Sequence, residues 1–170
     1  IVVAAVAAIV LGCVGAGVVA FLYFAPQFEP PEGVAVTVDA PSTLAVGEEA
    51  DIVISVENLL DETRELYDVD IYPPLVGAVQ IVAVEPLPRA VDPGMGFYTA
   101  SLNRDIAPRD TLAVTVTVRG DTPGNATGDV DVSIDALFSI VTTPVTLTVT
   151  ENGPDPTPDP TPESAPESAP

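Results

Sequence analysis

Residues 112–118 read Leu-Ala-Val-Thr-Val-Thr-Val, with a large apolar side chain at every second position. A repeat of two is that of a β-strand, in which successive side chains point to opposite faces of the sheet. The apolar positions therefore predict one face packed in a core, and the alternate positions predict a face turned away from it. Valine and threonine also favour strands, so this stretch indicates a β-fold.

Segments with the same repeat lie on both sides of this strand, at residues 34–38, 52–56, 69–71, 130–134 and 145–149. An apolar run at 76–84 and a segment at 97–102 are further candidate strands. About eight short strands, separated by Pro and Gly and without an amphipathic helix between them, predict an antiparallel β-sandwich. The fold class is therefore all-β, with an immunoglobulin-sized domain over residues 34–150.

The residue types that are absent from this domain exclude several kinds of bond and site. The single cysteine, Cys13, lies outside the β-region, so valine and isoleucine packing must hold the sandwich without a disulfide. The chain has no histidine, which removes the commonest general base and metal ligand. No constellation specifies a reaction, so we predict a protein that is not an enzyme and has no catalytic residues, cofactor or metal ligands.

The charge balance excludes one class of partner. The 170 residues include 25 acidic residues and only five arginines, with no lysine, and the net charge is −20. Such a surface repels phosphate backbones and offers no basic patch for them. Nucleic acid is therefore excluded as a partner.

The first 24 residues contain no charged side chain. As a helix they would be roughly 36 Å long, enough to cross a hydrocarbon core of roughly 30 Å. Pro26 ends the predicted helix, and residues 25–33 form an acidic, proline-containing neck. The first basic residue after the helix is Arg64, so the β-domain is predicted to face outward, at the cell surface. Because the chain begins at Ile1, we expect that a preceding segment has been removed.

Small residues recur along this predicted helix at a strict spacing of four, at Ala4, Ala8, Gly12, Ala16 and Ala20. They form a stripe on one face, and such a stripe lets helix backbones approach closely in lipid or in a bundle. We therefore predict that the helix packs against copies of itself. The alternative is that Ala and Gly are simply abundant in this segment. Residues 10–13 also match a lipoprotein cleavage motif loosely, but the apolar residues that follow Cys13 do not fit the polar linker expected after a lipidated cysteine.

The last segment, residues 151–170, repeats Pro-Asp-Pro-Thr and Glu-Ser-Ala-Pro. It has too few apolar residues to form a core, and its proline content favours an extended polyproline conformation. We predict a disordered Pro-rich tail.

Three further motifs have weaker functional interpretations. Aspartates alternate along two strand faces, Asp129, Asp131 and Asp135 on one and Asp68 and Asp70 on another, but no calcium-loop pattern accompanies them, and a solvated face is the simpler interpretation. Arg119-Gly120-Asp121 spells an integrin-type tripeptide in a predicted loop, where a plain turn is the simpler interpretation. In the same loop, Asn125-Ala126-Thr127 is an acceptor sequence for N-glycosylation.

Two stretches resemble a known family. Residues 41–58 contain Val46-Gly47-Glu48 and end in Ile-Ser-Val-Glu-Asn58, and residues 106–112 read Ile-Ala-Pro-Arg-Asp-Thr-Leu. They are similar to the immunoglobulin-like repeat and cell-adhesion-related domains of bacterial and archaeal surface proteins. The resemblance covers residues 36–136 and implies an exported adhesive or structural module, with no catalytic residues to carry over.

The sequence is compatible with two functions. The first is a surface subunit that resembles an archaeal pilin, in which the helix 1–24 forms a filament core and the β-domain forms the outer sheath. The early end of the helix at Pro26 and the absence of a glutamate at position 5 depart from that pattern. The second is a single-pass, membrane-anchored adhesion or sensory ectodomain.

Overall fold

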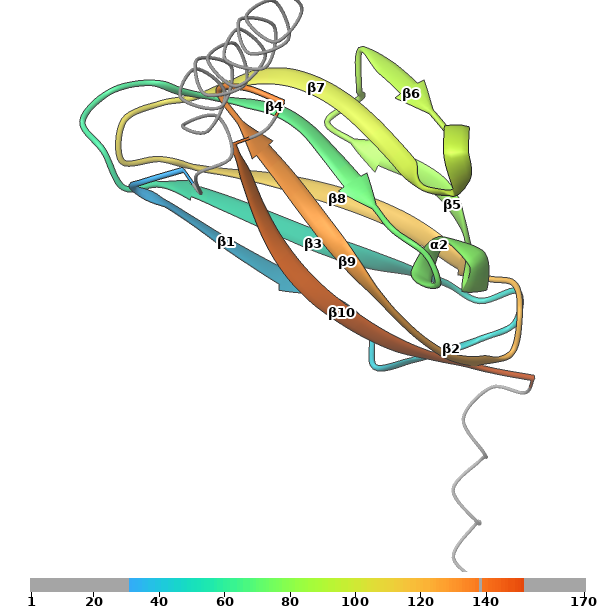
Figure 1. Cartoon of the computed structure of the whole chain (residues 1–170). Helices are drawn as coiled ribbons and strands as arrows, with labels where there is room; N and C mark the ends of the chain where they lie inside the picture. Colours follow the sequence, from blue (N-terminus) through green and yellow to red (C-terminus); the bar gives the residue numbers. More distant parts are fainter. Residues whose placement is uncertain (1–30, 138, 152–170) are drawn as a thin grey trace, which may run out of the picture.

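The computed structural model describes residues 31–137 and 139–151, which fold into two packed β-sheets (Figure 1). The four-stranded sheet has the order β1-β3-β8-β5, and the six-stranded sheet has the order β2-β10-β9-β4-β7-β6. The predicted all-β class is confirmed. The strands are β1 (Val34–Asp39), β2 (Thr43–Ala45), β3 (Glu49–Asn58), β4 (Arg64–Ile71), β5 (Val79–Glu85), β6 (Ala90–Asp92), β7 (Tyr98–Ile106), β8 (Thr111–Gly120), β9 (Gly124–Ile134) and β10 (Ile140–Thr150).

The strand order contains that of an immunoglobulin-like sandwich. When β2, β6 and β7 are set aside, seven strands remain, and they can be lettered A to G in chain order: β1, β3, β4, β5, β8, β9 and β10. One sheet then has the order A-B-E-D, and the other has the order G-F-C. This is the ABED and GFC arrangement of immunoglobulin constant-type domains. The β6–β7 hairpin extends the second sheet beyond β4, and β2 extends it beyond β10.

Alternating side chains from the two sheets make the core. On the long strands β3 and β8, every second residue is buried, in accordance with the repeat in the sequence. The opposite sheet contributes the matching residues of β4 and β9. Each of these core side chains is at most 1% exposed: Ile52, Ile54, Val56, Leu66, Val69, Ile71, Val114, Val116, Val118, Val130, Val132 and Ile134. Burying a side chain of this size stabilises the fold by about 1.5–3 kcal/mol.

One strand pair differs from the predicted antiparallel arrangement. β2 runs parallel to β10, with Leu44 in register with Val149. The chain crosses from the four-stranded sheet to the six-stranded sheet between β1 and β2, and β2 then continues alongside β10 in the same direction. Gly120 permits the close approach of β2 to β8, because a Cβ atom there would lie 2.3 Å from the Ala45 carbonyl oxygen.

Short elements account for the other differences from the sequence prediction. Two three-residue edge strands, β2 and β6, were not predicted, because three residues show no repeat. The apolar run at 76–84 divides into a one-turn helix, α2 (Leu75–Ala78), and strand β5. A single 3-10 turn, η2 (Gly94–Gly96), precedes β7.

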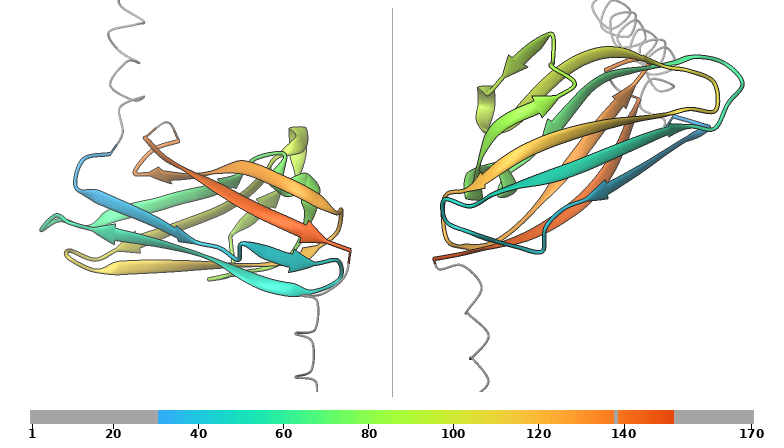
Figure 2. Two further views of the ribbon diagram at one scale, coloured as in Figure 1. Left: turned by 90° about the horizontal axis from the view of Figure 1, so that it is seen from below. Right: turned by 180° about the vertical axis from the view of Figure 1, so that it is seen from behind.

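The described chain enters and leaves the sandwich at opposite ends (Figure 2). At the entry, the Arg64 Nη1 atom donates a hydrogen bond to the carbonyl of Glu32, beside the β9–β10 turn. At the exit, Thr150 accepts a hydrogen bond from the Val46 amide, near the end of β8. The long axis of the domain therefore separates its two chain ends.

Two predicted segments lie outside the described residues. They are the helix 1–24, with the small-residue stripe at Ala4, Ala8, Gly12, Ala16 and Ala20, and the tail 151–170 apart from Glu151. Of the neck 25–33, only residues 31–33 are described. Within residues 31–137 and 139–151, no helix is long and apolar enough to cross a membrane.

Candidate functional site on the six-stranded sheet

The candidate site is a row of carboxylates on the face of the six-stranded sheet that is turned away from the core. Strands β4 and β9 are neighbours, and Asp70 lies directly opposite Asp131. One step along, Asp68 lies opposite Ser133. A bulge between Leu66 and Asp68 lets Leu66 stay in the core while Asp68 faces outward. The neighbouring strand β7 places Thr99 beside Asp70 and Ser101 beside Asp68.

Burial makes this face unusual. Asp68 is 3% exposed and Ser133 is 1% exposed, although both lie on the outer side of the sheet. Asp70 and Asp131 are half-buried. The Thr99 hydroxyl donates a 2.5 Å hydrogen bond to Asp70 Oδ1. Within the described chain, the buried side-chain oxygens without a hydrogen-bond partner are Asp68 Oδ1 and Asp131 Oδ1.

The titration of the site follows from this burial. Loss of water contact raises the pKa of the Asp68 carboxyl above its usual value, against the effect of a Ser133 hydrogen bond, and the charges of Asp70 and Asp131 add to the rise. Burial also raises the pKa of Asp70, opposed by Thr99 and reinforced by Asp131. Burial raises the pKa of the Tyr72 hydroxyl, and all three aspartates contribute. Neighbouring carboxylates therefore add to the effect of burial at both Asp68 and Asp70.

The structure brings together aspartates that the sequence placed on two separate strand faces. Asp68, Asp70 and Asp131 lie on one surface because β4 pairs with β9, and the pairing of strands remote in sequence cannot be deduced from alternation alone. Asp129 lies on the same strand but is exposed. Asp135 departs from the predicted row: it follows the end of β9 with a φ of 60° and binds Arg64.

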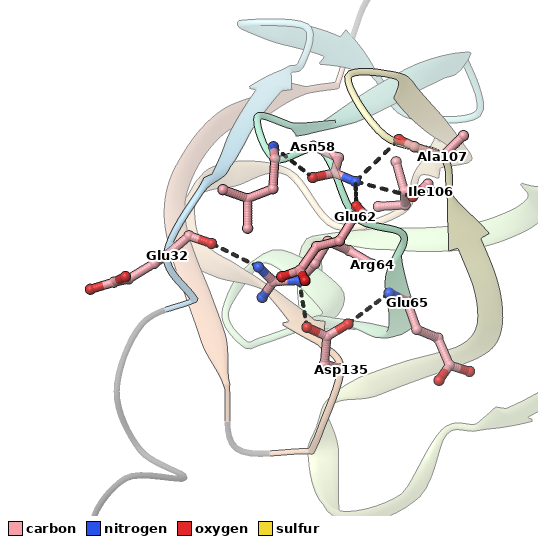
Figure 3. A network of polar contacts seen from close by, with 9 residues as sticks. Glu32, Asn58, Glu62, Arg64, Glu65, Ile106, Ala107 and Asp135 are labelled. Carbon is pink, nitrogen blue, oxygen red and sulfur yellow. Dashed lines mark hydrogen bonds and ion pairs between the residues drawn. The ribbon is translucent and has the colours of Figure 1, made fainter.

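Asp135 belongs to a polar network at the entry end of the sandwich (Figure 3). Arg64 Nε donates to Asp135 Oδ2 at 2.5 Å, while the Glu65 amide donates to Asp135 Oδ1 at 2.7 Å. The Arg64 side chain is 12% exposed and also reaches the Glu32 carbonyl at 2.9 Å. This network ties β4, the β9–β10 turn and the incoming chain together.

Asn58, the last residue of the resemblance motif, has a structural role beside this network (Figure 3). Its buried Nδ2 donates to the carbonyls of Glu62, Ile106 and Ala107 at 2.7, 3.2 and 3.1 Å. Its Oδ1 accepts a hydrogen bond from the Leu60 amide at 3.0 Å. One amide side chain thus satisfies the backbone groups of the β3–β4 and β7–β8 loops.

The tripeptide Arg119-Gly120-Asp121 is not displayed in a loop. Arg119 and Gly120 end strand β8, and Gly120 is buried. The guanidinium of Arg119 binds Glu49 Oε1 through Nε at 3.1 Å and Nη2 at 2.6 Å. Only Asp121 lies beyond the strand and is exposed. The prediction of a loop was therefore wrong for the first two residues, because β8 extends further than its alternating apolar positions.

The glycosylation candidate Asn125 is exposed, but it lies in β9 rather than in a loop. Its Oδ1 accepts a 2.7 Å hydrogen bond from the Thr148 hydroxyl on β10. A hollow of about 260 Å³ adjoins it between α2 and the β8–β9 turn, and its walls include Pro74, Gly77 and Pro123. No ionisable residue lines this hollow, so it offers no acid or base to a ligand. Glycosylation of Asn125 stays a prediction.

Comparison with known proteins assigns no family. No protein-family model and no curated protein matches this sequence. Among solved structures, the chain is similar to a family 123 glycoside hydrolase from Clostridium perfringens (11% identity, TM-score 0.46, 70% of this chain and 28% of the other). It is also similar to Salmonella alpha-2-macroglobulin (16%, 0.49, 69% and 7%) and to the CARDB domain of a Pyrococcus furiosus protein (14%, 0.45, 72% and 91%).

Two of these likenesses cover only a small part of the other protein. The chain spans about a quarter of the glycoside hydrolase and less than a tenth of the macroglobulin. All three TM-scores are below 0.5, so the immunoglobulin-like assignment rests on the strand order described above. No activity is transferred from any of them.

Proposed function

We propose that this protein is a non-enzymatic structural subunit of the cell surface. In this proposal, residues 1–24 pack against copies of themselves in a membrane or a filament core, and the β-sandwich is an in-line module that projects outward. The finer form is a pilin-like subunit, and the alternative is a single-pass anchored ectodomain.

The observation that carries the proposal is the separation of the two chain ends. The chain enters beside Arg64 and leaves beside Val46, at opposite ends of the sandwich, so the module adds its full length to whatever it connects. Two features of the sequence also support an outward position. The net charge of −20 favours a soluble, well-hydrated exterior, and the residues that follow Thr150 are rich in proline.

The filament form is tested at the small-residue stripe. Gly12→Leu places a large side chain on the stripe, whereas Val10→Leu changes the opposite face of the same predicted helix. Both variants keep the segment apolar. We expect negative-stain images of sheared surface material to show filaments, labelled by antibody to this chain, for the wild type and Val10→Leu but not for Gly12→Leu.

The same experiment separates the alternative. If the wild-type chain stays in the membrane fraction and no labelled filament forms, the pilin-like proposal is wrong and the anchored ectodomain is supported. The residues encoded before Ile1 give an independent test. A short basic leader with a prepilin-type cleavage site supports the filament, and a large cytoplasmic domain contradicts it.

A further inference from the structure

The outer face of β4 and β9 carries buried carboxylate oxygens that have no role in the proposed surface function. Asp68 is only 3% exposed, and its Oδ1 atom has no hydrogen-bond partner among the described residues. Asp131 Oδ1 is in the same condition on the adjacent strand. A buried carboxylate oxygen without a partner is costly, so a native protein needs a reason to keep one.

The two aspartates that carry the orphaned oxygens are diagonal neighbours in the strand register. Asp68 faces Ser133, and Asp131 is the next outward-facing residue along β9. Asp70, which follows Asp68 on the same face, stands opposite Asp131. The mutual influence of the three charges, which contributes to the pKa of Asp68, places them within electrostatic reach of one another. Three like charges on a half-buried surface repel each other, and a cation would remove that repulsion.

The other groups on this face are also hard oxygen donors. Ser133 and Ser101 flank Asp68, and Thr99 already binds Asp70. The described residues that face Asp68 and Asp131 from the neighbouring strands include no lysine, arginine or histidine. The ion pairs of the described chain instead use Asp135, Asp61 and Glu49. The charge of the site is therefore not balanced by the protein itself.

From this arrangement we infer that the face binds one hard divalent cation, of the calcium class, through the free Oδ1 atoms of Asp68 and Asp131. Ca²⁺ accepts six to eight oxygen ligands from carboxylates, neutral oxygens and water. Within the described chain, no three acidic side chains are grouped so that together they could hold a metal ion, so the proposed site uses two carboxylates, with hydroxyls and water in the remaining positions. A site with so few charged ligands predicts a dissociation constant of about 0.1–1 mM, in the range of extracellular modules.

The inference is tested on the full 170-residue chain in detergent at pH 7.5, with CaCl₂ as the probe and NaCl adjusted to constant ionic strength. Binding to the folded state alone raises the melting temperature, and we expect a rise on the order of 5 °C at saturating calcium. Asp68→Asn and Asp131→Asn should each abolish the rise. The matched control is Asp129→Asn, an exposed aspartate two residues from Asp131 on the same strand, and it should keep the full shift.

A second measurement locates the ion and does not depend on stability. The chain has no tryptophan, and Tyr72 directly follows the end of β4, where the charges of Asp68, Asp70 and Asp131 act on its hydroxyl. Excitation of tyrosine should therefore sensitise Tb³⁺ luminescence when TbCl₃ is added, and calcium should compete it away. Tyr72→Phe should reduce the emission by at least about half while calorimetry gives an unchanged calcium affinity, because the tyrosine ring reports on the ion without ligating it.

Three results would overturn the inference. The first is a melting temperature that calcium leaves unchanged at 10-fold above the highest expected dissociation constant. The second is an equal rise when NaCl replaces CaCl₂ at matched ionic strength, since that outcome means general screening. The third is a loss of the calcium effect in Asp129→Asn as complete as in Asp68→Asn. Circular dichroism of each variant shows that it is folded, and the Tb³⁺ signal decides the matter if one aspartate variant does not fold.

Discussion

Asp70 of β4 lies directly opposite Asp131 of β9, in register, on the outer face of the six-stranded sheet. Like charges placed opposite each other across two strands destabilise a sheet. The pair is nevertheless retained next to a third, buried carboxylate, Asp68. This repulsion should lower the free energy of unfolding, so substitutions on the acidic face can measure its effect on stability.

The pH dependence of stability should show that cost. Because the pKa values of Asp68 and Asp70 are raised above the usual 3.8, the folded state binds their protons more tightly than the unfolded state. Their contribution to stability is fully present below the unfolded pKa and is lost as the pH rises through the folded pKa. In metal-free buffer, the stability of the wild type relative to Asp68→Asn/Asp70→Asn should therefore increase as the pH falls from 7 toward 4, measured by urea denaturation. A difference that stays constant over this range would contradict the assignment.

Asn58 should be critical for the two loops that it joins. Asn58→Ala removes a buried amide and leaves the Leu60 amide and three carbonyls without their partner. We expect a loss of about 3 kcal/mol in the free energy of unfolding, measured by urea denaturation. Asn125→Ala in unglycosylated protein is the control, because Asn125 is exposed and accepts one hydrogen bond from Thr148; its loss should be below about 1 kcal/mol. Equal losses for the two variants would refute this role of Asn58.

Gly120 should not tolerate a side chain. A Cβ atom at this position would meet the Ala45 carbonyl oxygen at 2.3 Å, and because that atom is backbone, β2 or β8 must move. We expect Gly120→Ala to cost roughly 2–4 kcal/mol by thermal or urea unfolding. Gly77→Ala has no heavy atom within 4 Å of the new Cβ and lies in the helix α2, so it should be neutral or stabilise by up to about 1 kcal/mol.

Two arginines allow a partly buried ion pair to be compared with an exposed one. The Arg64 side chain is 12% exposed and bridges Asp135 and Glu32, whereas the Arg109–Asp61 pair is 61% and 86% exposed. Arg64→Ala should cost about 2 kcal/mol and reduce amide hydrogen-exchange protection near residues 33–35. Arg109→Ala should change the free energy of unfolding by less than about 0.5 kcal/mol. A comparable effect of both changes would show that the entry network does not hold the first strand.

Much of the fold could be predicted from the sequence because the long strands have one buried face. In segments such as 112–118 and 130–134, alternation with a repeat of two identifies both the strand and its core side chains. The three-residue strands β2 and β6 could not be found in this way, since a strand that short is too brief to show a repeat of two, even where its residues are buried, as Leu44 is in β2. The apolar run at 76–84 was ambiguous for a different reason: a one-turn helix and a strand can both be apolar when both are packed against the core.

The candidate site was harder to predict than the fold. Asp68, Asp70 and Asp131 were visible as alternating aspartates, but their association depends on the pairing of β4 with β9, about sixty residues apart in the chain. The bulge at Tyr67 was equally hidden, although it decides that Leu66 lies in the core while Asp68 and Asp70 face outward. Burial of an outward-facing aspartate has no signature in a single sequence.

The parallel pairing of β2 with β10 has a mechanical consequence. If the two ends of the domain are pulled apart, the first strands are drawn toward the entry and β10 is drawn toward the exit. Since β2 and β10 run side by side in the same direction, such tension slides one along the other and loads their hydrogen bonds together, as shear, rather than opening them one by one. The bonds from the Val46 amide to Thr150 and from the Thr148 amide to Ser42 would then break in one event. This patch of a few residues at the sheet edge would then resist extension of the module together with the pairing of β1 with β3.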